Sequence, residues 1–129
     1  MTTVTSSYWE KADNEKVLCT LCPHHCKMGE GQRGTCYIRG CQDGQVVLHS
    51  YGVSSGIAVD PIEKKPLYHF LPGSSVLSFG TVGCNLSCRF CQNWDISKAK
   101  ITERLSEEAS PEMLVGIARR SGAKSIAYT

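Results

Sequence analysis

Three closely spaced cysteines constrain this chain more than any other feature of its sequence. They follow the pattern Cys84-x3-Cys88-x2-Cys91, and Gly83 precedes the first of them. A cubane [4Fe-4S] cluster has four irons, which electron-transfer ferredoxins normally saturate with four cysteine thiolates. Three thiolates leave one iron free to take a small molecule, much as a catalytic metal keeps an open position. The number of cysteines therefore indicates a cluster that takes part in chemistry.

Two simpler interpretations of this triad stay open beside the cluster. Cys88 and Cys91 alone form a Cys-x2-Cys pair of the kind used in thiol exchange, although this leaves Cys84 without a role. A zinc ion would also accept the three thiolates, but structural zinc normally has a closed set of four ligands. We therefore expect an iron–sulfur cluster at Cys84, Cys88 and Cys91.

The residues around the triad resemble a known superfamily. An aromatic residue, Phe90, precedes the last cysteine, as in the radical S-adenosylmethionine enzymes. In that superfamily the free iron binds the amino and carboxylate groups of S-adenosylmethionine, and the reduced cluster cleaves this cofactor to a 5′-deoxyadenosyl radical. Residues 91–97 (CQNWDIS) and 60–73 (DPIEKKPLYHFLPG) are similar to the radical enzyme of the AmmeMemoRadiSam system. That group is described as related to pyruvate formate-lyase activating enzymes.

The resemblance implies further roles for residues near the triad. Phe90 would lie near the adenine of the cofactor, with ordinary packing as the alternative. Gln92 and Asn93 would line the cofactor edge, and Trp94 would either join them or belong to the core. An electron donor and a substrate, either a small molecule or a protein, are implied as well. Their identities do not follow from the sequence, and no general base is evident.

A second set of cysteines lies near the amino terminus, in the pattern Cys19-x2-Cys22-x3-Cys26-x9-Cys36. Four thiolates suit a closed tetrahedral zinc site or another cluster. A short polar segment has too small a hydrophobic core to be stable by itself and usually requires a metal or disulfides. We therefore predict a structural metal site there. The neighbouring His24 and His25 would replace a cysteine as ligand or, more simply, lie in the surrounding shell or at the surface. Cys41 falls outside the spacing and is expected to be a bystander thiol.

Composition excludes several classes of function. The chain has 129 residues, enough for one ordinary domain or two small ones. Its 14 basic and 12 acidic residues give a net charge of +2 without a block of like charges, which argues against nucleic acid as a partner. No apolar stretch approaches the ~20 residues that cross a membrane, and the first residues do not resemble a secretory signal. We expect a cytoplasmic protein, whose reducing surroundings keep the cysteines as thiols.

The second half of the sequence predicts a strand, a helix and another strand. Residues 75–80 are apolar and end at a glycine, which is typical of a buried parallel strand. Ser110 as the cap and Pro111 as the first helical residue predict the start of a helix, and Gly122 predicts its end. Strand character returns at 124–128. The apolar helical face that we expect to pack in the core consists of Met113, Leu114, Ile117 and Ala118.

The first half predicts less regular structure. Residues 36–39 and 45–49 read as the two strands of a hairpin around 40–44, because Asp-Gly between extended segments favours a tight turn. Residues 1–18 are expected to be a loosely ordered lead-in. The segment 60–73 contains charged residues that could contact a substrate. Its prolines and glycine are explained more simply by an ordered connection.

Together these elements predict an α/β fold. It would be the start of a partial (β/α) barrel, with the cysteine loop at the carboxyl end of its first strand. We expect a cysteine-rich segment and linker at 1–73 and the beginning of the barrel at 74–129. In the resembling family the barrel continues well past this length, so we expect these residues to form an N-terminal portion that is not catalytically competent alone. The alternative is a zinc-stabilised binding or adaptor module without catalytic activity.

Overall fold

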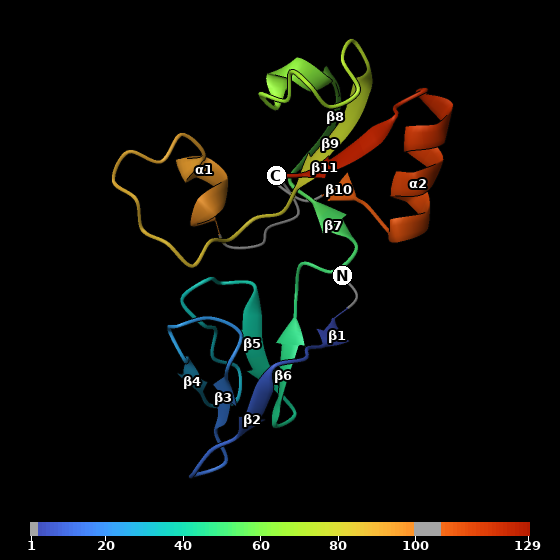
Figure 1. The fold of residues 1–129 in the computed structure, drawn as a ribbon. Helices are drawn as coiled ribbons and strands as arrows, with labels where there is room; N and C mark the ends of the chain where they lie inside the picture. The colour runs from blue at the N-terminus through green and yellow to red at the C-terminus, as the bar shows by residue number, and fades with distance from the viewer. Residues whose placement is uncertain (1–2, 100–106) are drawn as a thin grey trace. The chain divides into compact units, whose positions relative to one another are not determined.

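The chain forms two compact units, each built from two separate segments (Figure 1). The computed structural model describes residues 3–99 and 107–129. The first unit combines 1–51 with 82–105, and the second combines 52–81 with 106–129, within those described ranges. The division of the sequence into domains at residue 73 stays a prediction.

The first unit contains two small antiparallel sheets. One has the strand order β1 (Val4–Thr5), β6 (Gln45–Leu48), β5 (Arg39–Gln42), and the other has the order β2 (Trp9–Lys11), β3 (Val17–Cys19), β4 (Lys27–Met28). Side chains from both sheets meet in one buried cluster. This cluster consists of Val17, Cys19, Met28, Cys41 and Val46. The unit also includes α1 (Trp94–Ser97), which follows the cysteine loop.

The hairpin of β5 and β6 confirms one prediction and adjusts its bounds. The connection is a two-residue turn, Asp43-Gly44, and both residues have positive φ, 51° and 67°. This is the conformation that Asp-Gly favours between strands. The predicted strand at 36–39 is wrong except at Arg39, because β5 is Arg39–Gln42 and takes in residues that were assigned to the connection. The predicted lead-in is wrong for the described part of 1–18, because β1 pairs with β6 and β2 pairs with β3.

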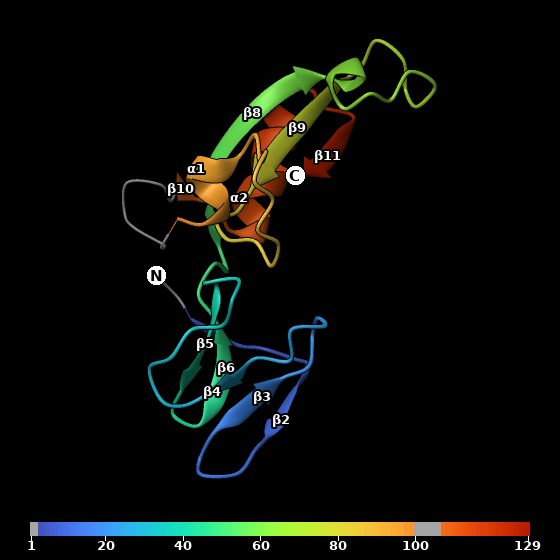
Figure 2. The ribbon, with the colours of Figure 1, turned by 90° about the vertical axis from the view of Figure 1, so that its left-hand side faces the viewer.

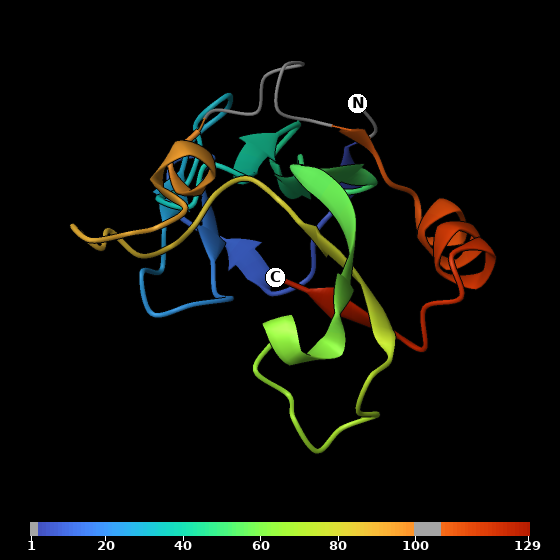
Figure 3. The ribbon, with the colours of Figure 1, turned by 90° about the horizontal axis from the view of Figure 1, so that it is seen from above.

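The second unit contains a three-stranded mixed sheet. Its order is β11 (Ser125–Tyr128), β9 (Ser75–Gly80), β8 (Gly56–Pro61), and the two longer strands β8 and β9 run side by side in Figure 2. The helix α2 (Pro111–Arg120) packs on this sheet through Leu114 and Ala118, which bury Leu77. A short antiparallel pair, β7 (Val53–Ser54) with β10 (Glu107–Glu108), completes the unit. Figure 3 shows the 3-10 helix Ile62–Lys64 and the following loop beyond the end of β8 and β9.

Several elements of this second unit were predicted correctly from local signals. The strand at 75–80 has the expected bounds, and α2 begins after Ser110, whose hydroxyl accepts a hydrogen bond from the Met113 N–H. Gly122 has φ of 70°, as the end of a helix often requires. The predicted apolar face is wrong at one position, because the Met113 side chain is exposed.

The predicted fold class is wrong. The strands lie mostly in small antiparallel sheets, and α1 and α2 are the two α-helices among the described residues. β11 is parallel to β9, but the other neighbour of β9 is β8, which is antiparallel. A (β/α) barrel requires parallel strands throughout. The chain is therefore not the start of such a barrel.

Among the described residues, no helix has the length and apolar character needed to cross a membrane.

Leu77 provides a test of the core of the second unit. Its side chain is fully buried, whereas that of its partner across the sheet, Val59, is 47% exposed. We expect Leu77→Ala to lower the free energy of unfolding by about 2–5 kcal/mol, because it removes buried methyl groups and leaves a cavity. Urea denaturation followed by circular dichroism would measure the change. The control, Val59→Ala, should cost much less, and equal costs would contradict this core assignment.

Candidate functional site

The three cysteines of the triad line one cavity in the first unit. They lie in the irregular segment before α1, where Cys84 and Cys91 are half-buried and Cys88 is exposed. The cavity has a volume of about 270 Å³. Its lining consists of Cys84, Leu86, Ser87, Cys88, Cys91, Trp94, Ser97 and Lys98. The loop therefore collects all three predicted ligands around one space.

The three thiols of this cavity do not converge as the ligands of a single metal ion do. Within the described residues, no three His, Cys, Asp or Glu side chains come close enough together to hold one metal ion. In a cubane, however, each cysteine binds a different iron, so the sulfurs surround the cluster and do not converge on one point. Three thiols spread around a cavity open to solvent are compatible with that arrangement.

Hydrogen bonds hold the ends of the cysteine loop. The Leu86 N–H donates to Cys84 Sγ at 3.4 Å, and the Cys91 thiol lies 3.7 Å from Ser97 Oγ, to which it donates. The ammonium of Lys98 donates to the Cys84 carbonyl at 3.0 Å. The Lys98 ammonium thus lies at the backbone of Cys84, and the Leu86 N–H is directed at its sulfur. The sequence did not single out Lys98, because nothing in its spacing relates it to Cys84.

The aromatic residues near the triad are exposed. Phe90 is 87% exposed and Trp94 is 73% exposed, so neither side chain belongs to a core. Trp94 lines the cavity, whereas the predicted cofactor-binding residues Phe90, Gln92 and Asn93 lie outside its lining. Their roles toward a cofactor stay predictions.

The structure brings the N-terminal cysteines only partly together. Cys19 is buried in the core of the first unit, and its N–H donates to the Cys26 carbonyl at 3.0 Å, so these two residues are neighbours across the β3–β4 hairpin. Cys26 Sγ accepts a hydrogen bond from the Thr35 N–H at 3.5 Å. Thr35 directly precedes Cys36 in the sequence. Cys22 and Cys36 are half-buried free thiols. A metal site at these four cysteines stays a prediction.

Two further residues near this set have defined partners. His24 Nε2 lies 2.6 Å from the Asn85 carbonyl oxygen, and since a carbonyl only accepts, Nε2 is the donor. Cys41 lies in the core of the first unit, and its thiol donates to Glu30 Oε2 at 3.8 Å. Burial, followed by the Glu30 carboxylate, raises the pKa of the Cys41 thiol.

The N-terminal cysteine segment contacts the triad loop directly within the first unit. Besides the bond from His24 to Asn85, Gly83 packs so closely on Cys36 and Ile38 that a side chain there would overlap them. The Lys98 ammonium also lies 5.9 Å from the centre of the Tyr37 ring, within range of a cation–π interaction. The two cysteine-bearing segments thus form one packed region.

The segment 60–73 of the second unit is held by its own charges. Asp60 pairs with Lys64 at 2.8 Å and with Lys65 at 3.5 Å, and the Lys64 hydrogen bond is the main cause that lowers the pKa of the Asp60 carboxyl. Glu63 accepts a hydrogen bond from the Gly73 N–H at 2.8 Å. These internal contacts favour the interpretation of an ordered connection over that of a substrate-binding segment.

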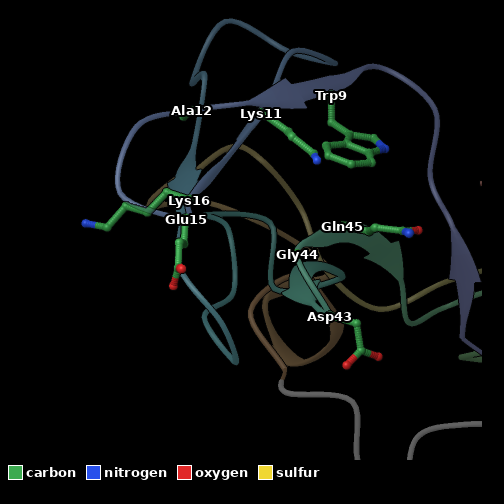
Figure 4. Close-up of a pocket in the computed structure, with 8 residues that line it drawn as sticks. All are labelled: Trp9, Lys11, Ala12, Glu15, Lys16, Asp43, Gly44 and Gln45. Atoms are coloured by element: carbon green, nitrogen blue, oxygen red, sulfur yellow. The ribbon is translucent and has the colours of Figure 1, made fainter.

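A larger cavity, of about 400 Å³, lies between the β2–β3 hairpin and the β5–β6 turn (Figure 4). Its lining consists of Trp9, Lys11, Ala12, Glu15, Lys16, Asp43, Gly44 and Gln45. The lining contains two lysines and two carboxylates, so its net charge is close to zero and favours neither an anion nor a cation as ligand. No predicted site residue lines this cavity.

Comparison with known proteins finds a longer relative. No protein-family model matches the chain, and no solved structure is significantly similar. Over 122 residues the chain is 43% identical to the uncharacterized protein MJ0808 of Methanocaldococcus jannaschii. The aligned region is 95% of this chain but 37% of that protein, so the chain spans little more than a third of the relative's length.

Proposed function

We propose that this chain binds a [4Fe-4S] cluster through Cys84, Cys88 and Cys91 and that the fourth iron binds S-adenosylmethionine. The observation that carries the proposal is the arrangement around one cavity of these three cysteines and, among the residues that the structure describes, of no fourth. The proposal does not depend on a (β/α) barrel. It depends on the number of ligand sulfurs and on the space between them.

The residues of the loop suit this role chemically. Partial exposure of the cysteines leaves access for a small molecule, and the Leu86 N–H and the Lys98 ammonium supply positive charge near the Cys84 ligand. Leu86 and Trp94 contribute apolar surface to the lining of the cavity. When bound and reduced, the cluster would supply the electron that cleaves the sulfonium of S-adenosylmethionine to a 5′-deoxyadenosyl radical.

The chain would supply the cluster-binding part of a radical S-adenosylmethionine enzyme similar to pyruvate formate-lyase activating enzymes. Its relative is much longer, so a region matching the rest of that relative would bind the substrate and complete the cofactor site. A reducing electron donor is required. We place the chain in a reducing compartment such as the cytoplasm, which would keep the cysteines available as ligands.

Anaerobic reconstitution with iron and sulfide tests this proposal. We expect about one cubane per chain, a brown colour that bleaches with dithionite, and an electron paramagnetic resonance signal of the reduced cluster that changes when S-adenosylmethionine is added. Adenosine is the control, because it lacks the amino and carboxylate groups that the open iron would bind. An unchanged spectrum would contradict the open iron, and zinc in place of iron would favour a non-catalytic module.

A further inference from the structure

One peptide group in the triad loop has hydrogen bonds at both of its ends. The carbonyl of Asn85 accepts from His24 Nε2 at 2.6 Å. The amide of the same peptide unit, the Leu86 N–H, donates to Cys84 Sγ at 3.4 Å. A continuous chain of hydrogen bonds therefore runs from the imidazole through the peptide to a predicted ligand sulfur.

Hydrogen bonds that are linked in series through one peptide group strengthen one another. A donor at the carbonyl oxygen withdraws electron density from the peptide and makes its N–H a stronger donor. The imidazole thus increases the positive end of the dipole that faces Cys84 Sγ. It also restricts the orientation of the peptide, which in this loop has no regular secondary structure to hold it.

We infer that His24, through the Asn85–Leu86 peptide, raises the reduction potential of a cluster bound at Cys84. This inference rests on the proposed function and extends it to a residue of the N-terminal segment. Hydrogen bonds to the sulfurs help to set the potential of an iron–sulfur cluster. Reduction adds negative charge to the cluster, and an N–H dipole directed at a ligand sulfur stabilises that charge. His24 is a positioning residue, because it acts through the Asn85–Leu86 peptide, whose carbonyl oxygen accepts its hydrogen bond.

The midpoint potential of the reconstituted full chain, from a redox titration followed by electron paramagnetic resonance, provides the test. We expect His24→Ala to shift the potential to a more negative value. His24→Gln should restore most of it, since the glutamine amide also donates a hydrogen bond. The matched control is His25→Asn, which alters the adjacent histidine and tolerates its positive φ of 44°. That variant should keep the wild-type potential.

A double-mutant cycle tests the route of the effect. Leu86→Pro removes the N–H that faces Cys84 and should itself lower the potential. In that background His24→Ala should cause no further shift, and an undiminished second shift would overturn the proposed route. If the Leu86→Pro variant binds no cluster, the midpoint potentials of His24→Ala and His24→Gln still test the inference.

The outcomes separate this inference from the proposed function. If the wild-type chain takes up no cluster, the proposed function fails first. If it takes up a cluster but the His24 variants keep the wild-type potential, only the inference is overturned. If His24→Ala loses its iron while His24→Gln retains it, the imidazole holds the loop in place and does not tune the cluster, which also contradicts the inference.

Discussion

Replacing Cys88 by serine should remove essentially all cluster-bound iron and sulfide from the reconstituted chain, together with the signal of the reduced cluster. Cys88 is the central cysteine of the loop, and it lines the cavity with Cys84 and Cys91. A serine hydroxyl is a much poorer ligand for iron than a thiolate, and the remaining two cysteines would have to hold a cluster with two open irons. We expect the same loss for Cys84→Ser and Cys91→Ser. Iron and sulfide analysis after anaerobic reconstitution would measure it.

The control for this experiment is Ser87→Ala. Ser87 lines the same cavity and is exposed, but it has no ligand sulfur. Its substitution should leave iron and sulfide at the wild-type level, with the circular dichroism spectrum unchanged. Retention of a full cluster by Cys88→Ser would refute the ligand assignment. Zinc bound in equal amounts by the wild type and by all three serine variants would show that the triad is not the metal site.

The elements that sequence predicted correctly are those specified by neighbouring residues. Ser110 and Pro111 define the start of α2 because the hydroxyl caps the helix and proline suits its first position. The turn at Asp43-Gly44 likewise depends on two residues that adopt positive φ. Such signals act over a few residues, so a single sequence is enough to reveal them.

The errors concern partners that are distant in sequence. Val4 pairs with Leu48, and the buried strand β9 takes the antiparallel β8 as its second neighbour. Burial makes a strand apolar on both faces whether its neighbours are parallel or antiparallel, so the apolar character of 75–80 did not decide the fold class. The strand at 75–80, the helix and the final strand were predicted correctly as elements, but the parallel barrel inferred from their order was wrong.

The candidate site shows the same contrast. The spacing of Cys84, Cys88 and Cys91 predicted ligands that the structure places around one cavity. The contact of His24 with Asn85 joins residues 61 positions apart, and that of Lys98 with the Cys84 carbonyl depends on how the loop folds. Neither has a sequence signal. The burial of Cys19 has none either, because Val17, Leu18 and Cys19 are all apolar and their alternation in burial is visible only in the structure.

Replacing Gly83 by alanine should both destabilise the first unit and reduce cluster loading. Gly83 has φ of 93°, which an L side chain rarely adopts, and an added Cβ would overlap the Cys36 carbonyl oxygen and lie 2.5 Å from Ile38 Cγ2. Backbone strain costs about 1–2 kcal/mol, and the overlap adds about 1–3 kcal/mol. We therefore expect the free energy of unfolding to fall by about 2–5 kcal/mol. Chemical denaturation would measure this fall.

Gly31 offers a control that separates strain from overlap. It lies in the same unit and has a similar positive φ of 74°, but an added Cβ there would meet no atom within 4 Å. Gly31→Ala should lower the free energy of unfolding only by the contribution of backbone strain, about 1–2 kcal/mol. Its iron content after reconstitution should equal that of the wild type. Because Gly83 leads into Cys84, moving it away from Cys36 and Ile38 would also displace the first ligand of the cavity. Equal destabilisation by the two variants, with equal iron content, would show that the N-terminal segment does not hold the triad loop in place.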